Sequence, residues 1–158
     1  MSELRIMHKS FQFRKQATRG ASLIEVLVAV LILGIGMLGI AAMQATALSN
    51  SQSSVERTQA VLHTYSIFDA MRANRNLALT NGFSPAGDTG LMCAPPAGGN
   101  LAANTVRQWI TDIIASNQTG CGRIRNLGAG VFEITVQWND QRGTSGAANQ
   151  QLVTVSRL

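Results

Sequence analysis

Residues 21–158 contain no lysine, and no proline precedes Pro85. Aromatic residues make up only 5% of the chain and charged residues 13%, which argues against a nucleic-acid-binding surface. His63 is the only histidine after residue 20, and Ser66, one turn away, has nothing to form an oxyanion site with it. No glycine-rich phosphate loop and no histidine-rich cluster occurs. The sequence therefore predicts no enzyme, no bound metal, no cofactor and no small-molecule substrate.

The positive charge of the chain is concentrated in its first residues. The formal net charge is +5, but residues 1–20 hold five of the 13 basic groups and only one acid. Residues 21–158 keep eight basic and seven acidic groups, a formal charge of +1. Positive charge before an apolar segment and little after it predicts a cytoplasmic N-terminus and an exported C-terminal part.

An apolar run follows this basic leader. Val26 to Met43 are 18 consecutive residues without charge. At about 1.5 Å per helical residue they span roughly 27 Å, close to the hydrocarbon core of a bilayer. Glu25 lies at the mouth of the run. An ionised side chain deep in a transmembrane helix costs roughly 2.5 to 3.5 kcal/mol on insertion scales. The acid therefore implies a function and a partner, the alternative being a signal-anchor helix with an incidental glutamate.

The residues around this acid resemble a known signal. Gly20-Ala21-Ser22-Leu23-Ile24-Glu25, after a basic leader, resembles the class III signal of type IV prepilins and type II secretion pseudopilins. The resemblance implies that prepilin peptidase cuts after Gly20 and methylates the new amine of Ala21. Ala21 departs from the family pattern, in which Phe or Met is commoner. In such proteins Glu25 would pair with the N-terminal ammonium of a neighbouring subunit.

Two further segments are similar to the PilV group of minor pilins. They are residues 36–39, Gly-Met-Leu-Gly, and residues 71–75, Met-Arg-Ala-Asn-Arg. The resemblance implies a low-abundance subunit that joins other minor pilins and the major pilin in a priming complex near the pilus tip. It implies roles in pilus assembly, twitching motility and cell adhesion. Arg72 and Arg75 also have a simpler explanation, as cations at a helix C-terminus, with Asp69 pairing to Arg72.

The resemblance and the hydropathy pattern divide the chain into three parts. Residues 1–20 form a cleaved leader, 21–47 the transmembrane and assembly half of a long helix, and 48–158 an exported pilin-like domain. The expected location is the bacterial inner membrane, crossed once, with the C-terminal domain in the periplasm or carried into the pilus.

The patterns after the membrane run predict an α+β fold of type IV pilin-like architecture. One helix is expected from about Ser22 to about Leu77, its second half packed on a small antiparallel sheet. Its apolar stripe is expected to form core, and its members recur at helical spacing: Leu48, Val55, Val61, Leu62, Tyr65, Phe68 and Met71. A second, amphipathic helix is predicted over 104–114, with capping residues at its start. Strict alternation predicts a strand over 131–138, and a second strand is predicted over 151–157.

Cys93 and Cys121 both fall in the part expected outside the cytoplasm. An oxidising compartment would let them pair, closing a loop of roughly 30 residues that is worth about 3 to 4 kcal/mol. Two separate buried thiols are the alternative.

Two other functions stay open on the sequence alone. The first is a minor pseudopilin of a type II secretion system. The second is a signal-anchored module whose exported domain binds DNA or another ligand, with Arg107, Arg123 and Arg125 as a small basic patch. The charge of +1 favours a solvated surface for these arginines.

Overall fold

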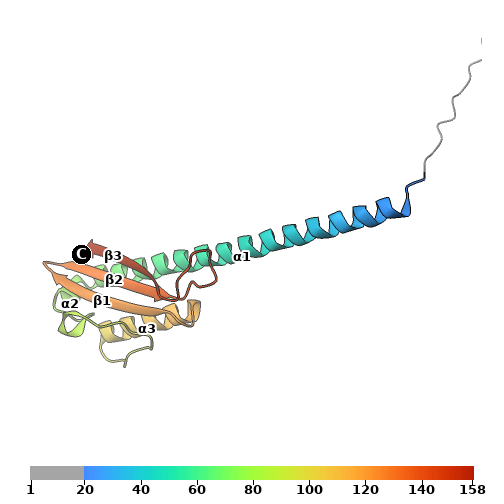
Figure 1. Ribbon diagram of the computed structural model, residues 1–158. Coiled ribbons are helices and arrows are strands. Elements are labelled where there is room, and N and C mark those ends of the chain that lie inside the picture. The colour runs from blue at the N-terminus through green and yellow to red at the C-terminus, as the bar shows by residue number, and fades with distance from the viewer. Residues whose placement is uncertain (1–19) are drawn as a thin grey trace, which may run out of the picture. The chain divides into compact units, whose positions relative to one another are not determined.

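The computed structural model describes residues 20–158 and divides the chain into two compact units, Met1–Ala41 and Ala42–Leu158. The predicted leader lies outside the described residues except for Gly20. The elements are α1 (Leu23–Ala73), α2 (Arg75–Leu79), the 3-10 turn η1 (Pro85–Gly87), α3 (Leu101–Ser116), β1 (Cys121–Gly128), β2 (Val131–Trp138) and β3 (Gln150–Arg157) (Figure 1). The predicted α+β class, a long N-terminal helix packed on a small antiparallel sheet, is confirmed.

Helix α1 runs for 51 residues without a proline and ends four residues earlier than predicted. Asn74 interrupts it with φ −123° and ψ 47°, and the short helix α2 follows at once. The Asn74 side chain donates to the carbonyl of Ala70 at 3.2 Å. A side chain that bonds to nearby backbone competes with helix continuation, so asparagine is a reasonable place for α1 to stop.

One face of α1 in the second unit builds the core. Its buried residues are Ala60, Thr64, Ile67, Phe68 and Met71. The prediction of a core stripe was correct for Phe68 and Met71 and wrong for Leu48, Val55, Leu62 and Tyr65, which are 63%, 53%, 62% and 59% exposed. Leu62 lies about 200° around the helix from Ala60, on the opposite face. Heptad spacing correctly placed Leu48, Val55 and Leu62 on one face of the helix. The face that packs against the rest of the unit is a different one, which contains the small residue Ala60.

Helix α3 is longer than predicted at both ends. Its N-cap is Asn100, whose side-chain oxygen accepts from the N–H of Ala103 at 2.9 Å, so the capping residues expected at 104 and 105 lie inside the helix. Of the five apolar positions expected on one face, Val106, Trp109, Ile110 and Ile113 are buried and Ile114 is partly buried. Ala102, in the first turn, is buried as well. Trp109 Nε1 donates to the carbonyl of His63 at 2.9 Å, tying α3 to α1.

The sheet has three antiparallel strands in the order β1-β2-β3. The predicted inner face of β2 is confirmed, because Phe132, Ile134, Val136 and Trp138 are at most 3% exposed.

Strand β1 was not predicted, since Cys-Gly-Arg-Ile-Arg-Asn-Leu-Gly has little apolar alternation and two glycines. The first of these glycines, Gly122, is required by packing. A Cβ there would lie 2.6 Å from Trp109 Cη2 and 2.7 Å from Ile110 Cδ1, so the close approach of β1 to α3 requires glycine.

Candidate functional site

The candidate site begins at the amino end of α1. Gly20, Ala21 and Ser22 precede the helix and are exposed. The Ser22 carbonyl accepts from the N–H of Glu25 at 2.9 Å and from that of Val26 at 3.3 Å. The Ser22 hydroxyl also lies 3.4 Å from the Glu25 N–H, at the long end of hydrogen bonding. Ser22 therefore starts the helix two residues after the predicted cut.

The sequence analysis placed the helix start at about Ser22 but did not identify Ser22 as a capping residue. Its signal was present, because Ser22 and Glu25 match the Ser-x-x-Glu pattern of a capping box before an apolar run. A helix that starts at a fixed residue also fixes where Glu25 falls on its surface.

Glu25 lies in the first turn of α1 and is exposed. A carboxylate there is stabilised by the unpaired N–H groups and the positive end of the helix dipole. Within residues 20–158 it forms no ion pair.

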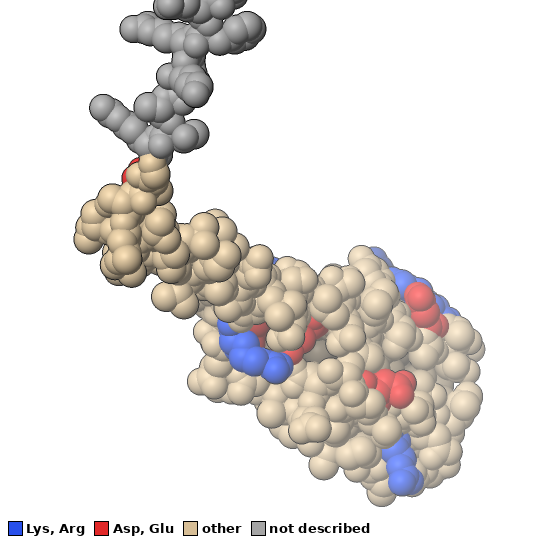
Figure 2. Space-filling model, turned by 90° about the vertical axis from the view of Figure 1, so that its right-hand side faces the viewer, with Lys and Arg blue, Asp and Glu red and all other residues tan. Residues whose placement is uncertain are grey.

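The apolar surface after Glu25 is continuous. Every residue from 26 to 43 is exposed, and the large apolar side chains among them are 47% to 73% exposed. Of the described helices, α1 is the one long and apolar enough to cross a membrane. In Figure 2 this stretch is tan, a red group lies at its end beside the grey residues, and most blue and red side chains lie on the second unit. Such a surface is compatible with lipid or with other apolar helices, and not with water.

The two cysteines belong to the second unit, whereas Gly20, Ala21 and Glu25 belong to the first. The structure joins Cys93 and Cys121 in a disulfide. The bond ties the segment before α3 to the first residue of β1, beside the backbone bonds between Met92 and Gly122 at 2.8 and 2.9 Å. Its role here is to hold a loop onto the sheet.

The histidine has a partner that the sequence did not suggest. His63 Nε2 lies 2.8 Å from the Ser116 hydroxyl on α3, whereas Ser66 donates to the backbone carbonyl of His63. Burial lowers the pKa of His63, and the negative charge of Asp112 offsets part of this shift. The Ser116 hydroxyl also bonds to carbonyls of its own helix, so this contact joins two helices and does not activate a nucleophile.

Two of the three arginines considered as a basic patch are paired. Arg123 Nε donates to the Asp88 carboxylate at 2.8 Å, and this contact, with a bond from the Gly90 N–H, lowers the pKa of Asp88 to about 2. Arg125 lies 3.4 Å from Glu133. Their charge is largely compensated, which disfavours a nucleic-acid surface. No cluster of three metal-ligating side chains occurs in residues 20–158.

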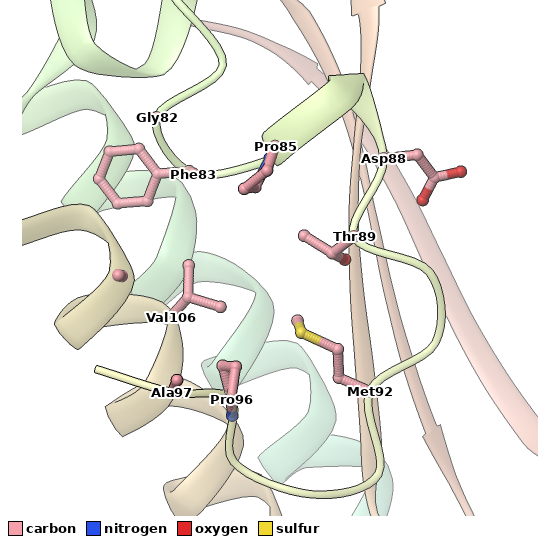
Figure 3. Close-up of a pocket in the computed structure, with 10 residues that line it drawn as sticks. Gly82, Phe83, Pro85, Asp88, Thr89, Met92, Pro96, Ala97 and Val106 are labelled. Carbon is pink, nitrogen blue, oxygen red and sulfur yellow. The ribbon is translucent and has the colours of Figure 1, made fainter. Parts of the chain in front are cut away.

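A cavity of about 270 Å³ lies between α3 and the loop that precedes it. Its walls are mostly apolar, with Phe83, Pro85, Met92, Pro96 and Val106 among them. Figure 3 shows the Asp88 carboxylate pointing away from this space. The cavity therefore offers apolar contact and no titratable group aimed inward.

Comparison with protein families gives one match. Residues 15–41 match the prokaryotic N-terminal methylation motif, which covers the predicted cut, Glu25 and most of the apolar run. Comparisons with curated proteins and with solved structures gave no match. The motif implies processing by prepilin peptidase and assembly with other pilins, and it suggests a structural protein. Together with the apolar helix it supports a membrane-anchored, single-pass protein of the type IV pilin or pseudopilin kind.

Proposed function

We propose that this chain is a minor pilin of the PilV group, which joins a membrane priming complex and helps to initiate type IV pilus assembly. The observation that carries the proposal is an exposed carboxylate, Glu25, in the first helical turn before an apolar surface of 18 residues. Neither feature serves the fold of the second unit, since α1 contributes to the core only from Ala60 onward.

The mechanism rests on charge pairing in an apolar setting. Prepilin peptidase cuts after Gly20, removes residues 1–20 and methylates the amine of Ala21. In the assembled state the Glu25 carboxylate pairs with the N-terminal ammonium of a neighbouring subunit, and the Ala21 ammonium of this chain is free to pair in the same way. An unpaired carboxylate in the membrane is costly, so only a register that pairs it is stable. The pairing thus selects the axial position at which a subunit enters.

The same proposal assigns locations to the parts of the chain. Residues 21–47 remain in the inner membrane or in the fibre core, with the N-terminus on the cytoplasmic side. Residues 48–158 fold in the periplasm, where the disulfide between Cys93 and Cys121 forms, and reach the cell surface when the complex is carried out at the pilus tip. The partners are prepilin peptidase, the other minor pilins and the major pilin.

The test replaces Glu25 by alanine in the full chain in its native host. We expect Glu25→Ala to remain in the membrane at wild-type level, to lose co-purification with minor pilins, and to reduce the number of surface pili at least tenfold. Asp69→Ala is the matched control, because Asp69 is an exposed acid on the same helix, 3.0 Å from Arg72. It should leave assembly unchanged.

Three results would overturn the proposal. Unchanged pili and co-purification in Glu25→Ala would remove the role of the carboxylate. Normal pili with loss of secreted enzymes would assign the chain to a type II secretion system. Retention of residues 1–20, with ligand binding by the anchored chain, would favour a signal-anchored binding module.

A further inference from the structure

The two edges of the sheet differ in how they are covered. The edge of β1 is occupied by residues 88–92. Thr89 N–H donates to the carbonyl of Ile124 at 3.0 Å, and the Ile124 N–H donates to the Thr89 hydroxyl at 3.0 Å. Asp88 and Arg123 add an ion pair, and a bulge interrupts β1 between Asn126 and Gly128. This edge cannot accept another strand.

The edge of β3 has no such cover. All eight residues pair with β2 in one unbroken register. Leu158 N–H donates to the carbonyl of Gly130, and hydrogen-bonded pairs alternate along antiparallel strands, so the even-numbered residues of β3 bond to β2. The N–H and C=O groups of Gln151, Val153 and Val155 therefore point away from the sheet. Within residues 20–158 no hydrogen bond reaches them from another segment.

Natural proteins usually guard such an edge with proline, lysine, a bulge or a covering segment. Strand β3 has none of these. Val153 and Val155 are 51% and 55% exposed, although valine favours a covered strand face. A regular edge strand of eight residues, with two exposed valines and a single charge, Arg157, near its end, is a template for an added strand. Main-chain bonds would supply affinity and alternate side chains specificity.

The geometry of α1 argues against a second copy on this edge. Early in the second unit's part of α1, the Ser53 hydroxyl donates to the carboxylate of Asp140, which precedes β3. Near the end of α1, the Arg72 guanidinium donates to the hydroxyl of Ser156, near the end of β3. Within the second unit α1 and β3 thus run in the same direction (Figure 1). Two copies that pair identical edges about a two-fold axis have antiparallel strands, hence antiparallel helices. The Ala42 ends of the two helices, which lead along the chain into the apolar runs, would then lie at opposite ends of the pair, an arrangement unsuited to two subunits anchored on one side of a membrane.

We propose that β3 accepts an extended strand from a different membrane-anchored, pilin-like subunit, which extends the sheet at this edge. The added strand places two apolar side chains against Val153 and Val155 and a carboxylate beside Arg157, which is exposed and forms no ion pair within the described residues. The identity of the subunit as pilin-like rests on the proposed function; the strand pairing rests on the sheet alone.

Substitutions on the open side of β3 test the proposal in the full chain, in the native membrane. Val155→Pro removes an N–H that points outward and spares the bonds to β2. Val153→Lys places a charge on the edge strand. Leu91→Lys is the matched control, because Leu91 is an exposed apolar residue, 45% exposed, away from this edge. Both β3 variants should lower the amount of co-purified pilin subunit at least tenfold, and the control should not.

A second measurement keeps the test independent of folding and of the proposed function. A photoreactive residue at position 155 should form cross-links that map to an extended segment of another pilin-like subunit, and one at 91 should not. Wild-type co-purification in Val155→Pro and Val153→Lys would overturn the strand pairing, even where Glu25→Ala abolishes assembly. Cross-links to a second copy, to residues 1–19 or to no protein would also overturn it. Intact strand cross-links with normal pili in Glu25→Ala would instead count against the proposed function alone.

Discussion

The two units of the chain differ in whether they bury apolar residues. In residues 26–41 leucine, isoleucine and valine are all exposed, whereas in the second unit Ile67, Ile110 and Ile134 are at most 1% exposed. The second unit is a folded core built by burying apolar area from water. Residues 26–41 have the composition of a core, yet each of them is exposed, so this surface is suited to lipid or to other apolar helices. Among the described residues, burial of apolar side chains is therefore confined to the second unit.

The largest expected effect is on the core of the second unit. Phe132→Ala leaves a cavity at a residue that is 0% exposed, and we expect it to lower the free energy of unfolding by about 3 to 5 kcal/mol. Leu31→Ala, at a residue 63% exposed in the first unit, should leave that unfolding unchanged. Hydrogen exchange of the β2 amides in the detergent-solubilised chain measures both. Equal destabilisation by the two variants would contradict the claim that the core lies in the second unit alone.

Loss of the disulfide should come next in size. Cys93 and Cys121 are 28 residues apart, and the double serine variant should lower the free energy of unfolding of the second unit by about 3 to 4 kcal/mol. Urea unfolding of the full chain, followed by tryptophan fluorescence, gives the number. The reduced wild-type chain should show the same loss. A wild-type denaturation midpoint in the serine variant would contradict this account of the loop.

A pair of glycines compares the units directly. Gly122→Ala forces a Cβ into Trp109 and Ile110, and overpacking of this kind costs about 1 to 3 kcal/mol. At Gly36 an added Cβ meets nothing within 4 Å, so Gly36→Ala should leave unfolding of the second unit unchanged. The thermal midpoint of the second unit is the readout. A destabilising Gly36→Ala would show that the first unit supports the fold.

The smallest effect concerns pH. Burial lowers the pKa of His63 in the folded state, so the unfolded chain binds the proton more readily. The contribution of this group is fully present above its unfolded pKa of about 6.5 and is lost as the pH falls below that value. The thermal midpoint should therefore drop between pH 7.5 and 5.5 in the wild type and drop less in His63→Gln. A parallel drop in both would show that other groups cause it.

The sequence predicted the features that depend on local pattern. The alternation in β2 has the period of a strand, and the apolar stripe of α3 has the period of a helix. The apolar run after Glu25 has the length of a membrane-spanning helix. Each of these patterns is compatible with few other structures. The outward orientation of Leu48, Val55 and Leu62 was not predictable, because a helical stripe shows that residues share a face and not what covers it. Likewise β1 owes its place to long-range contacts, with Gly122 against Trp109, that no local pattern reveals.

The candidate site followed the same rule. Gly20, Ala21 and Glu25 lie within six residues, so their order alone carried the motif. The open edge of β3 depends on register and on what covers β1, and only the assembled sheet distinguishes the two edges.

The most direct test of the account is the intact mass and N-terminal sequence of the membrane-extracted chain, with and without prepilin peptidase. The account predicts a chain that starts at methylated Ala21 when the peptidase is present and keeps residues 1–20 when it is absent. A chain that keeps residues 1–20 in both strains would contradict it, since the chain would then lack the free Ala21 amine that the proposed pairing between neighbouring subunits requires.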